Sequence, residues 1–167
     1  MDTVRSRLVL SELQSGQLAA AEHVGLVVPS INDAMQSMGQ LGYRWSSVAR
    51  PCATVRRGGR VEENELLYVT TCGPLPRIKM IEEVPGSYWI QDREGLAFHH
   101  LSYWVDDLTE STEHLLSGGN YRIDADGLNP DGTLRYRYLR GGAGIRIELG
   151  LRANRDEFER WAENTAP

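Results

Sequence analysis

The sequence has few of the features that mark secreted, membrane-bound or nucleic-acid-binding proteins. Its 167 residues include two cysteines, Cys52 and Cys72, which form no CxxC pair and suggest no disulfide framework. No apolar run approaches the roughly 18 residues of a membrane span, and the apolar stretch Leu8–Leu10 is too short for a signal peptide. Acidic residues outnumber basic ones by 23 to 18, and the net charge of -5 argues against a nucleic-acid partner. We therefore expect a cytoplasmic protein with no nucleic-acid or membrane partner.

The composition that remains is ordinary for a globular protein, with 41% hydrophobic and 25% charged residues. The clearest segment is Ala97–Val105, whose aromatic and branched residues predict a mostly buried strand. Side chains alternate along a strand, so we expect His99 and His100 to point to opposite faces. A buried histidine by itself is more often a core residue than a ligand. A second copy of the pattern, earlier in the chain, favours a ligand here.

The second copy lies 77 residues upstream and aligns without a gap. Each copy has a strand with a histidine, a helix N-cap, an apolar helix stripe and a terminating glycine. The matched pairs are His23 with His100, Ser30 with Asp107, Ile31 with Leu108, Met38 with Leu115, and Gly42 with Gly119. Met35 and Leu41 complete the apolar stripe of the first helix. This internal repeat is the strongest signal of how the chain is organised.

Each copy continues with three strand-like segments between glycine-rich turns. In the first copy they are Tyr43–Val55, Glu65–Thr71 and Arg77–Glu82, and in the second they are Tyr121–Ile123, Leu134–Leu139 and Ile145–Leu149. After the second copy, Asn154 and Glu157 predict the cap of a last helix that buries Phe158 and Trp161. The predicted division is an extension over 1–18, a first module over 19–84, a linker over 85–96, a second module over 97–150 and a terminal helix over 151–167.

Two βαβββ units with a histidine in each first strand resemble the vicinal oxygen chelate superfamily, which includes glyoxalase I, methylmalonyl-CoA epimerase, extradiol dioxygenases and bleomycin-resistance proteins. The resemblance covers roughly residues 20 to 150. It rests on the strand His23–Val28, the segment His99–Asp107 and the closing segment Gly144–Leu149. It implies an α+β fold in which the two modules form a curved mixed sheet around a cavity, followed by a C-terminal helix. It also implies a homodimer, for which Phe158 and Trp161 offer apolar surface.

The resemblance further implies metal ligands from the first and last strands of the modules, at His23, His100 and Glu148. Imidazole and carboxylate groups suit Fe(II), Mn, Co, Ni or Zn. Strand alternation supports the choice of Glu148, because it places Glu148 and Arg146 on the face opposite to Ile145, Ile147 and Leu149. A salt bridge to a neighbouring arginine is the competing explanation for Glu148.

The sequence departs from the family at the fourth ligand position, where it has Lys79. An ammonium has no lone pair to give and repels a divalent cation. Three outcomes stay open. The site can be a triad of two histidines and one carboxylate, as in extradiol dioxygenases. Lys79 can replace the metal and pair with Glu148. A register slip can instead present Glu82, which is the least favoured outcome.

These residues predict an enzyme acting on a small anionic or enolisable carbonyl compound by metal-assisted proton transfer, of an isomerase, epimerase or lyase type. Glu148, Tyr138 and Lys79 are the catalytic candidates, and Tyr138 can equally be a packed strand residue. By strand parity, the residues expected to bind substrate are Arg77, Arg146, Ser102 and Trp104. Two alternatives remain. The spacing from Tyr138 to Glu148 resembles that of extradiol dioxygenases, which predicts an Fe(II) oxygenase. The other alternative is a metal-free small-molecule binding or resistance protein.

Overall fold

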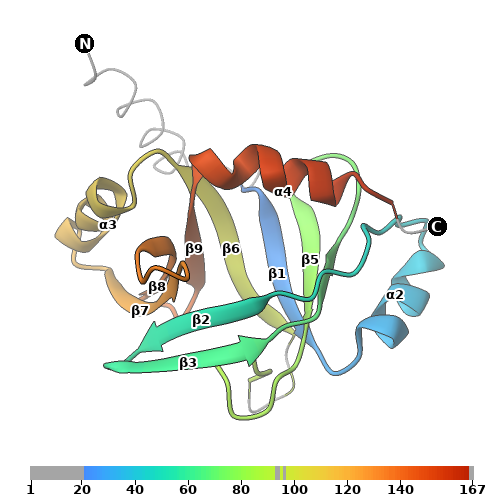
Figure 1. Cartoon of the computed structure of the whole chain (residues 1–167), viewed down its shortest axis with the longest axis horizontal. Helices are drawn as coiled ribbons and strands as arrows, with labels where there is room; N and C mark the ends of the chain where they lie inside the picture. The colour runs from blue at the N-terminus through green and yellow to red at the C-terminus, as the bar shows by residue number, and fades with distance from the viewer. Residues whose placement is uncertain (1–20, 93–94, 96, 166–167) are drawn as a thin grey trace.

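The computed structural model describes residues 21–92, 95 and 97–165. One curved sheet of nine strands carries three α-helices in this part of the chain (Figure 1). The first half contains β1 (His23–Val28), α2 (Ile31–Gly39), β2 (Cys52–Arg57), β3 (Arg60–Glu65), β4 (Tyr68–Thr70) and β5 (Arg77–Glu82). The second half contains β6 (Phe98–Val105), α3 (Leu108–Ser117), β7 (Tyr121–Leu128), β8 (Leu134–Gly141) and β9 (Arg146–Leu151). A short 3-10 helix, η2 (Arg152–Asn154), leads into α4 (Arg155–Ala162).

The first strands of the two halves lie side by side at the centre of the sheet. The strand order is β3-β2-β7-β8-β9-β6-β1-β5-β4. β1 and β6 are antiparallel to each other, and each also pairs in parallel with the last strand of its own half, β5 or β9. His23 and His100 are therefore on neighbouring strands of one sheet. The expected α+β fold with a curved mixed sheet and a C-terminal helix is confirmed.

The hairpin of β2 and β3 belongs to the first half in sequence but pairs with the second half. β2 is antiparallel to β7, with Val55 opposite Gly127. Just before β2, Ala49 bridges to Tyr68 on β4, at the other end of the sheet. The expected single strand Tyr43–Val55 is thus wrong, because the chain leaves β4 there and crosses to β7. The strand β3, rich in glutamate, was not expected, since it has no alternating apolar pattern. The division into two superposable modules stays a prediction.

The two faces of the sheet have different partners. On the convex face α2 packs against Val28, Val69 and Met80, and α3 packs on the side of Leu139 and Leu149. Both helices begin at the expected caps. Ser30 accepts a hydrogen bond from the N–H of Asp33, and Asp107 accepts from those of Thr109 and Glu110. Leu41, expected on the buried stripe, is 76% exposed because α2 ends before it.

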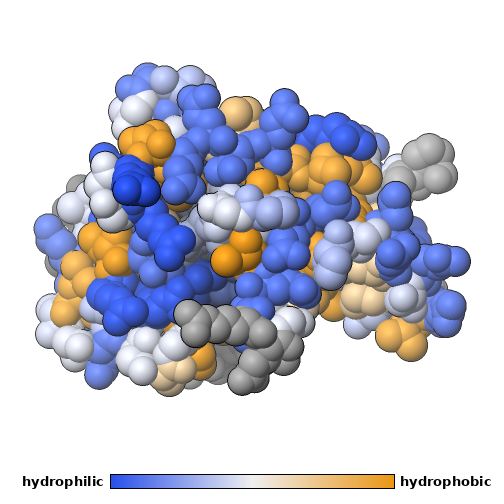
Figure 2. All heavy atoms as spheres, turned by 90° about the horizontal axis from the view of Figure 1, so that it is seen from below, coloured by the Kyte–Doolittle hydropathy of each residue, from blue (hydrophilic) through white to orange (hydrophobic). Residues whose placement is uncertain are grey.

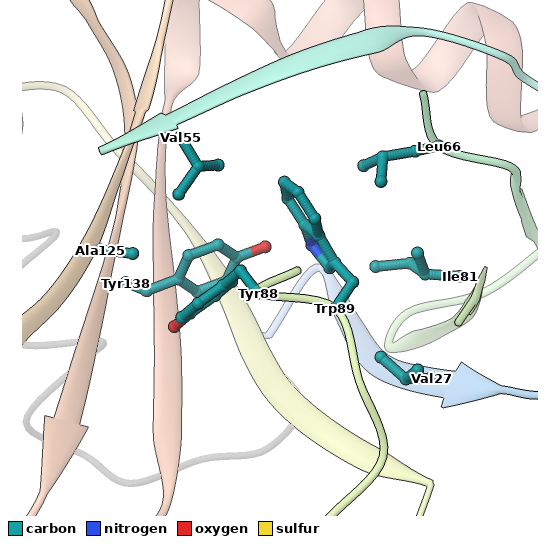
Figure 3. Packing of buried hydrophobic residues seen from close by; sticks show 8 residues of the cluster. All are labelled: Val27, Val55, Leu66, Ile81, Tyr88, Trp89, Ala125 and Tyr138. Carbon is teal, nitrogen blue, oxygen red and sulfur yellow. The ribbon is translucent and has the colours of Figure 1, made fainter. Parts of the chain in front are cut away.

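The concave face is closed at its base by residues that the sequence placed in the linker. Tyr88 and Trp89 are 3% and 1% exposed, and they pack with Val55, Leu66 and Tyr138 inside the curve of the sheet (Figure 3). Burial of two large aromatic side chains is a major apolar contribution to the core. The segment between the two halves is therefore part of the core and not only a connection.

α4 lies across the curved sheet at the edge opposite the β2–β3 hairpin (Figure 1). It follows Asn154 as expected, but the Asn154 side chain makes no capping hydrogen bond. Its Phe158 ring stacks on the ring of His23 at 5.7 Å, and Trp161 Nε1 donates to the carbonyl of Ser47. Phe158 and Trp161 thus pack within the chain, on the concave side. None of the described helices has the length and apolar composition needed to cross a membrane.

Candidate metal centre and cavity

Three side chains bring their donor atoms together at the centre of the concave face. His23 Nε2 and His100 Nε2 are 3.1 Å apart, and the carboxylate oxygens of Glu148 lie 3.8 Å and 3.7 Å from these nitrogens. Ligands that surround one ion at about 2.0–2.2 Å are about 3–4 Å from one another. Two imidazoles and one carboxylate form a donor set that transition metals accept. The three residues therefore fit a divalent metal ion.

The register of the strands explains how these three residues meet. Gly25 on β1 pairs with both His100 on β6 and Lys79 on β5, and Ser102 on β6 pairs with Glu148 on β9. Gly25 is required here because a methyl group at that position would overlap the imidazole of His100. The ring of His100 thus lies directly over the backbone of β1, which brings it within reach of His23.

Burial and neighbouring charge set the protonation of the three groups. Burial, followed by the positive charge of Lys79, lowers the pKa of His23 well below its ordinary value. Burial likewise lowers the pKa of His100, with contributions from His99 and Lys79. Both rings are therefore neutral at pH 7, which is the form that binds a metal.

The Glu148 carboxylate stays ionised although it is buried. Burial by itself would raise its pKa, but the positive charge of Lys79, the nearby His23 and hydrogen bonds from Tyr138 and Ser102 lower it below its ordinary value. The Ser102 hydroxyl donates to Glu148 Oε1 at 2.9 Å. The site therefore contains one firm negative charge, with two neutral rings beside it.

Lys79 supplies the opposing positive charge, and aromatic rings hold it in place. Its ammonium lies 4.5 Å from the ring centre of Tyr68 and 5.8 Å from that of Phe158. Contact of a cation with ring faces contributes about 0.5–2 kcal/mol. Lys79 lines the cavity, whereas Glu82 accepts a hydrogen bond from the N–H of Ile31 at the start of α2. The register slip that would present Glu82 as a ligand is therefore wrong.

These groups open onto a cavity of about 460 Å³ whose wall is mainly aromatic. His23, Lys79 and Glu148 line one side. The aromatic wall consists of Tyr68, Trp89, Trp104, Tyr136, Tyr138, Phe158 and Trp161. A cavity of this size suits a small molecule, and the mixture of aromatic wall and central charges is typical of ligand sites.

The residues expected to bind substrate fall into two groups in the structure. Trp104 lines the cavity. Ser102 is not part of the lining, but its hydroxyl donates a hydrogen bond to Glu148, which is. Arg77 and Arg146 lie outside the cavity lining, because each is held in an ion pair elsewhere. The guanidinium of Arg77 bridges Glu22 and Glu163, and Arg146 Nε donates to Asp124 at 3.0 Å. Tyr138, a catalytic candidate, is 2% exposed and faces Glu148 across the β8–β9 pair.

Sequence reasoning missed most of the aromatic wall. Tyr68 and Tyr136 lie in short or irregular strands, and Trp89 lies in the linker, so strand parity gave no basis for choosing them. The sequence predicts that the last helix buries Phe158 and Trp161, and the family resemblance offers them as apolar surface for a second subunit. Their helical spacing of i and i+3 was a signal that both face the same side, but only the fold shows that this side is the cavity.

His99 was expected to face away from His100, and this is wrong. His99 is the extra residue of a β-bulge in β6, since Gly25 pairs with His100 and Leu26 already pairs with Phe98. A bulge interrupts the alternation of side chains. As a result the two rings contact each other, with their Nδ1 atoms 2.9 Å apart. Burial, followed by the charge of Arg146, lowers the pKa of His99 to about 3.

A cup-shaped sheet with two histidines and a glutamate at its centre defines the class of protein. The family model described as "Glyoxalase/Bleomycin resistance protein/Dioxygenase superfamily" matches residues 22–132. The chain belongs to this superfamily, and the resemblance seen in the sequence is confirmed. None of the curated proteins compared with the chain matches it.

Several solved structures share the fold at low sequence identity. A methylmalonyl-CoA epimerase in complex with methylmalonyl-CoA and NH4+ has a TM-score of 0.56 and 12% identity, over 82% of this chain and 96% of that one. The methylmalonyl-CoA epimerase from Mycobacterium tuberculosis has a TM-score of 0.52 and 17% identity, over 86% and 95%. A hypothetical protein from Bacillus halodurans C-125 has a TM-score of 0.50 and 18% identity, over 79% and 93%. At these identities the likeness shows the fold alone.

Proposed function

We propose that this protein is a divalent-metal-dependent enzyme that moves a proton next to the carbonyl of a small anionic or enolisable compound. The reaction type is that of an isomerase, epimerase or lyase. One observation carries the proposal. Three buried donor atoms of the types that bind Fe, Mn, Co, Ni or Zn lie within 4.8 Å of one another at the wall of a cavity sized for a small molecule. The epimerases with the same fold add an analogy only.

In this proposal His23, His100 and Glu148 hold the ion. When bound, the ion would polarise the substrate oxygens and favour the enolate form. Lys79 faces the same space, and its ammonium pairs with the anionic group of the substrate. The aromatic wall, with Trp104 and Phe158 near the ligands, excludes water and so strengthens these charge interactions.

Two residues of the chain have the properties needed to manage the proton. Glu148 is ionised at neutral pH and accepts hydrogen bonds, so it can take a proton from the carbon next to the carbonyl. Burial and the neighbouring Glu148 charge raise the pKa of Tyr138 well above its ordinary value, so its hydroxyl keeps its hydrogen. Tyr138 therefore donates a hydrogen bond to Glu148, and the proton that Glu148 takes up is returned to the product by the Glu148 carboxyl.

A metal-free binding or resistance protein is the second candidate, and Lys79 favours it. The ammonium sits in the place of a fourth ligand and lowers the pKa of both histidines, as a bound cation would. Metal analysis of the purified protein separates the two candidates. About one equivalent of a transition metal, lost in His100→Ala, supports the enzyme. Tight ligand binding with no metal supports the binding protein. An Fe(II) oxygenase remains the third reading, and consumption of dioxygen with a catechol would support it.

The reaction itself is tested by exchange of carbon-bound hydrogen with heavy water. Metal-loaded protein is incubated in D2O with a panel of 2-oxo acids, β-keto acids and methylmalonyl-CoA, and deuterium uptake is followed by NMR. We expect uptake next to one carbonyl, with Glu148→Gln at least about 100-fold slower, because loss of an acid–base group costs this much. Equal rates in the two proteins would contradict the proposal.

The homodimer and the cytoplasmic location also remain proposals. Phe158 and Trp161 line the cavity of their own chain, so they no longer support a dimer interface. One face shows hydrophilic residues with separate hydrophobic patches (Figure 2). Light scattering at several concentrations tests the dimer, and fractionation of the source cells tests the location.

A further inference from the structure

The bulge residue His99 is absent from the mechanism above, yet it lies against a proposed ligand on a chain of three contacts. His99 Nε2 is 3.2 Å from the carbonyl oxygen of Tyr88. His99 Nδ1 is 2.9 Å from His100 Nδ1. His100 Nε2 is in turn 3.1 Å from His23 Nε2. His99 and His100 are 4% and 0% exposed, so water cannot easily replace these partners.

The protons along this chain can be assigned from one end. The carbonyl oxygen of Tyr88 has no hydrogen to give, so the contact requires a hydrogen on His99 Nε2. His99 is buried, and the Arg146 guanidinium donates to its carbonyl oxygen, so a positive charge on the His99 ring is disfavoured. A neutral ring has one N–H, which leaves His99 Nδ1 as an acceptor. The reverse assignment would place two lone pairs against each other at the Tyr88 carbonyl.

The rest follows for His100. Because His99 Nδ1 accepts, His100 Nδ1 must supply the hydrogen between the two rings. A neutral His100 with its hydrogen on Nδ1 has a bare lone pair on Nε2. That nitrogen is the one that points to His23 and Glu148. Hydrogen bonds to the far nitrogen of a ligand histidine commonly fix its tautomer and ring orientation.

We infer that His99 is a positioning residue that fixes the tautomer of His100, so that Nε2 of His100 is held ready to accept a divalent metal ion. The β-bulge is what makes this possible, because without the extra residue His99 would lie on the other face of β6. The inference about the metal rests on the proposed function, whereas the tautomer does not depend on it.

The same reasoning shows that His23 has no equivalent support. Its Nδ1 is buried and has no hydrogen-bond partner among the residues that the structure describes. In the metal-free protein the short contact with His100 Nε2 requires His23 to carry its hydrogen on Nε2. To bind a metal, His23 must move that hydrogen to Nδ1, where no acceptor from the described part of the chain receives it. One ligand is thus prepared in advance and the other is not.

The first test is NMR of the metal-free full-length protein, in which nitrogen-15 spectra report which ring nitrogen bears hydrogen. We expect His100 with hydrogen on Nδ1 and His99 with hydrogen on Nε2. His100 with hydrogen on Nε2 would overturn the inference, whether or not the protein ever binds a metal. Because no substitution is needed, this measurement does not depend on the folding of a variant.

The second test compares two substitutions by titration calorimetry with Zn²⁺ and Mn²⁺. His99→Asn keeps an acceptor oxygen near the position of Nδ1, and we expect it to bind metal within about threefold of the parent. His99→Phe keeps the ring and removes both nitrogens, and we expect a 10–100-fold weaker affinity, as for other residues that hold ligand histidines. Equal affinity in His99→Phe and the parent would overturn the inference. If the parent binds no metal, the metal part of the proposed function fails and the tautomers alone decide this inference.

Discussion

The two halves of the molecule supply matching strands to the site, but they support their histidines differently. His100, from the second half, contacts His99 through the far side of its ring and lies over the bare backbone of Gly25. His23, from the first half, stacks on Phe158, and its Nδ1 has no partner within the described ranges of the chain. The repeat in the sequence is thus symmetric where the environment is not. A matched position in a repeat tells which residue is present, but not what holds it.

The last strands of the halves differ even more. β9 supplies Glu148, a carboxylate that is buried, ionised and hydrogen-bonded by Ser102. β5 supplies Lys79 at the corresponding place, where the ammonium lies over the rings of Tyr68 and Phe158. The second half therefore supplies the carboxylate, together with the histidine whose Nδ1 has a partner, and the first half supplies the ammonium. This difference leads us to expect substrate on the side of Lys79.

Gly25→Ala should have the largest effect, because it disturbs His100, the better supported of the two proposed histidine ligands. The added methyl overlaps the ring of His100, so we expect a metal affinity at least about 100-fold lower, beyond the effect of losing a supporting residue. Crowding of this kind also costs about 1–3 kcal/mol of stability. Titration calorimetry and urea unfolding measure the two effects.

Gly39→Ala is the matched control. It lies in α2, where an added methyl would have no heavy atom of a described residue within 4 Å, so the protein should be unchanged or up to about 1 kcal/mol more stable. Unaltered metal binding in Gly25→Ala would mean that His100 does not occupy the position described.

Lys79→Glu should make the two halves alike. The change replaces an ammonium that repels a metal ion by a carboxylate that can bind one. The affinity of the site for Mn²⁺ or Ni²⁺ should therefore rise at least tenfold, which is about 1.4 kcal/mol. Activity should fall for two reasons. The new carboxylate fills a position that the substrate needs, and the substitution removes the ammonium that pairs with the substrate. Calorimetry and the deuterium-exchange assay measure the two results.

Lys79→Met removes the charge without adding a ligand and serves as the control. Its gain in metal affinity should be smaller than that of Lys79→Glu. If neither variant differs from the parent in affinity, the ammonium does not act on the donor cluster and the comparison between β5 and β9 fails.

Phe158→Ala tests the support of His23. Loss of an aromatic partner costs about 0.5–1.5 kcal/mol, so metal affinity should fall about 2- to 10-fold, less than in Gly25→Ala. Tyr43→Ala removes an exposed aromatic side chain outside the cavity lining and should not change metal affinity. If metal affinity fell more in Phe158→Ala than in Gly25→Ala, the support of His23 would matter more than that of His100, contrary to this comparison.

The smallest effect concerns acid stability in the second half. Burial would raise the pKa of Asp124, but hydrogen bonds from Arg140 and Tyr88 and nearby guanidinium charges lower it from 3.8 to about 2. The carboxylate therefore stabilises the folded state fully above about pH 4, and this contribution is lost as pH falls towards 2.

Asp124→Asn should remove this dependence. After allowance for partial exposure to solvent, we expect the variant to be about 1 kcal/mol less stable at pH 7, with the difference shrinking to near zero at pH 2. Urea unfolding at several pH values measures it. Stability curves that run parallel down to pH 2 would contradict the assignment.

Much of the candidate site followed from the sequence because the proposed ligands lie on regular strands. A 77-residue repeat paired His23 with His100, and period-two alternation placed Glu148 on the concave face. The strand β5 appeared with the expected bounds, which put Lys79 in register with Gly25. In these places the local pattern and the fold agree, so the sequence alone was enough to predict the positions of these residues.

Tertiary structure alone decided the features that depend on irregular pairing or on distant contacts. The β-bulge turned His99 towards His100, the crossing of β2 to β7 closed the cup, and α4 folded back to place Phe158 on His23. Arg77 and Arg146 were drawn into ion pairs with Glu22 and Asp124 instead of the cavity. The physical reason is common to all of them. Alternation and capping act within a few residues, whereas a bulge, a charge partner or a covering helix is selected by the free energy of contacts that exist only after the chain has folded.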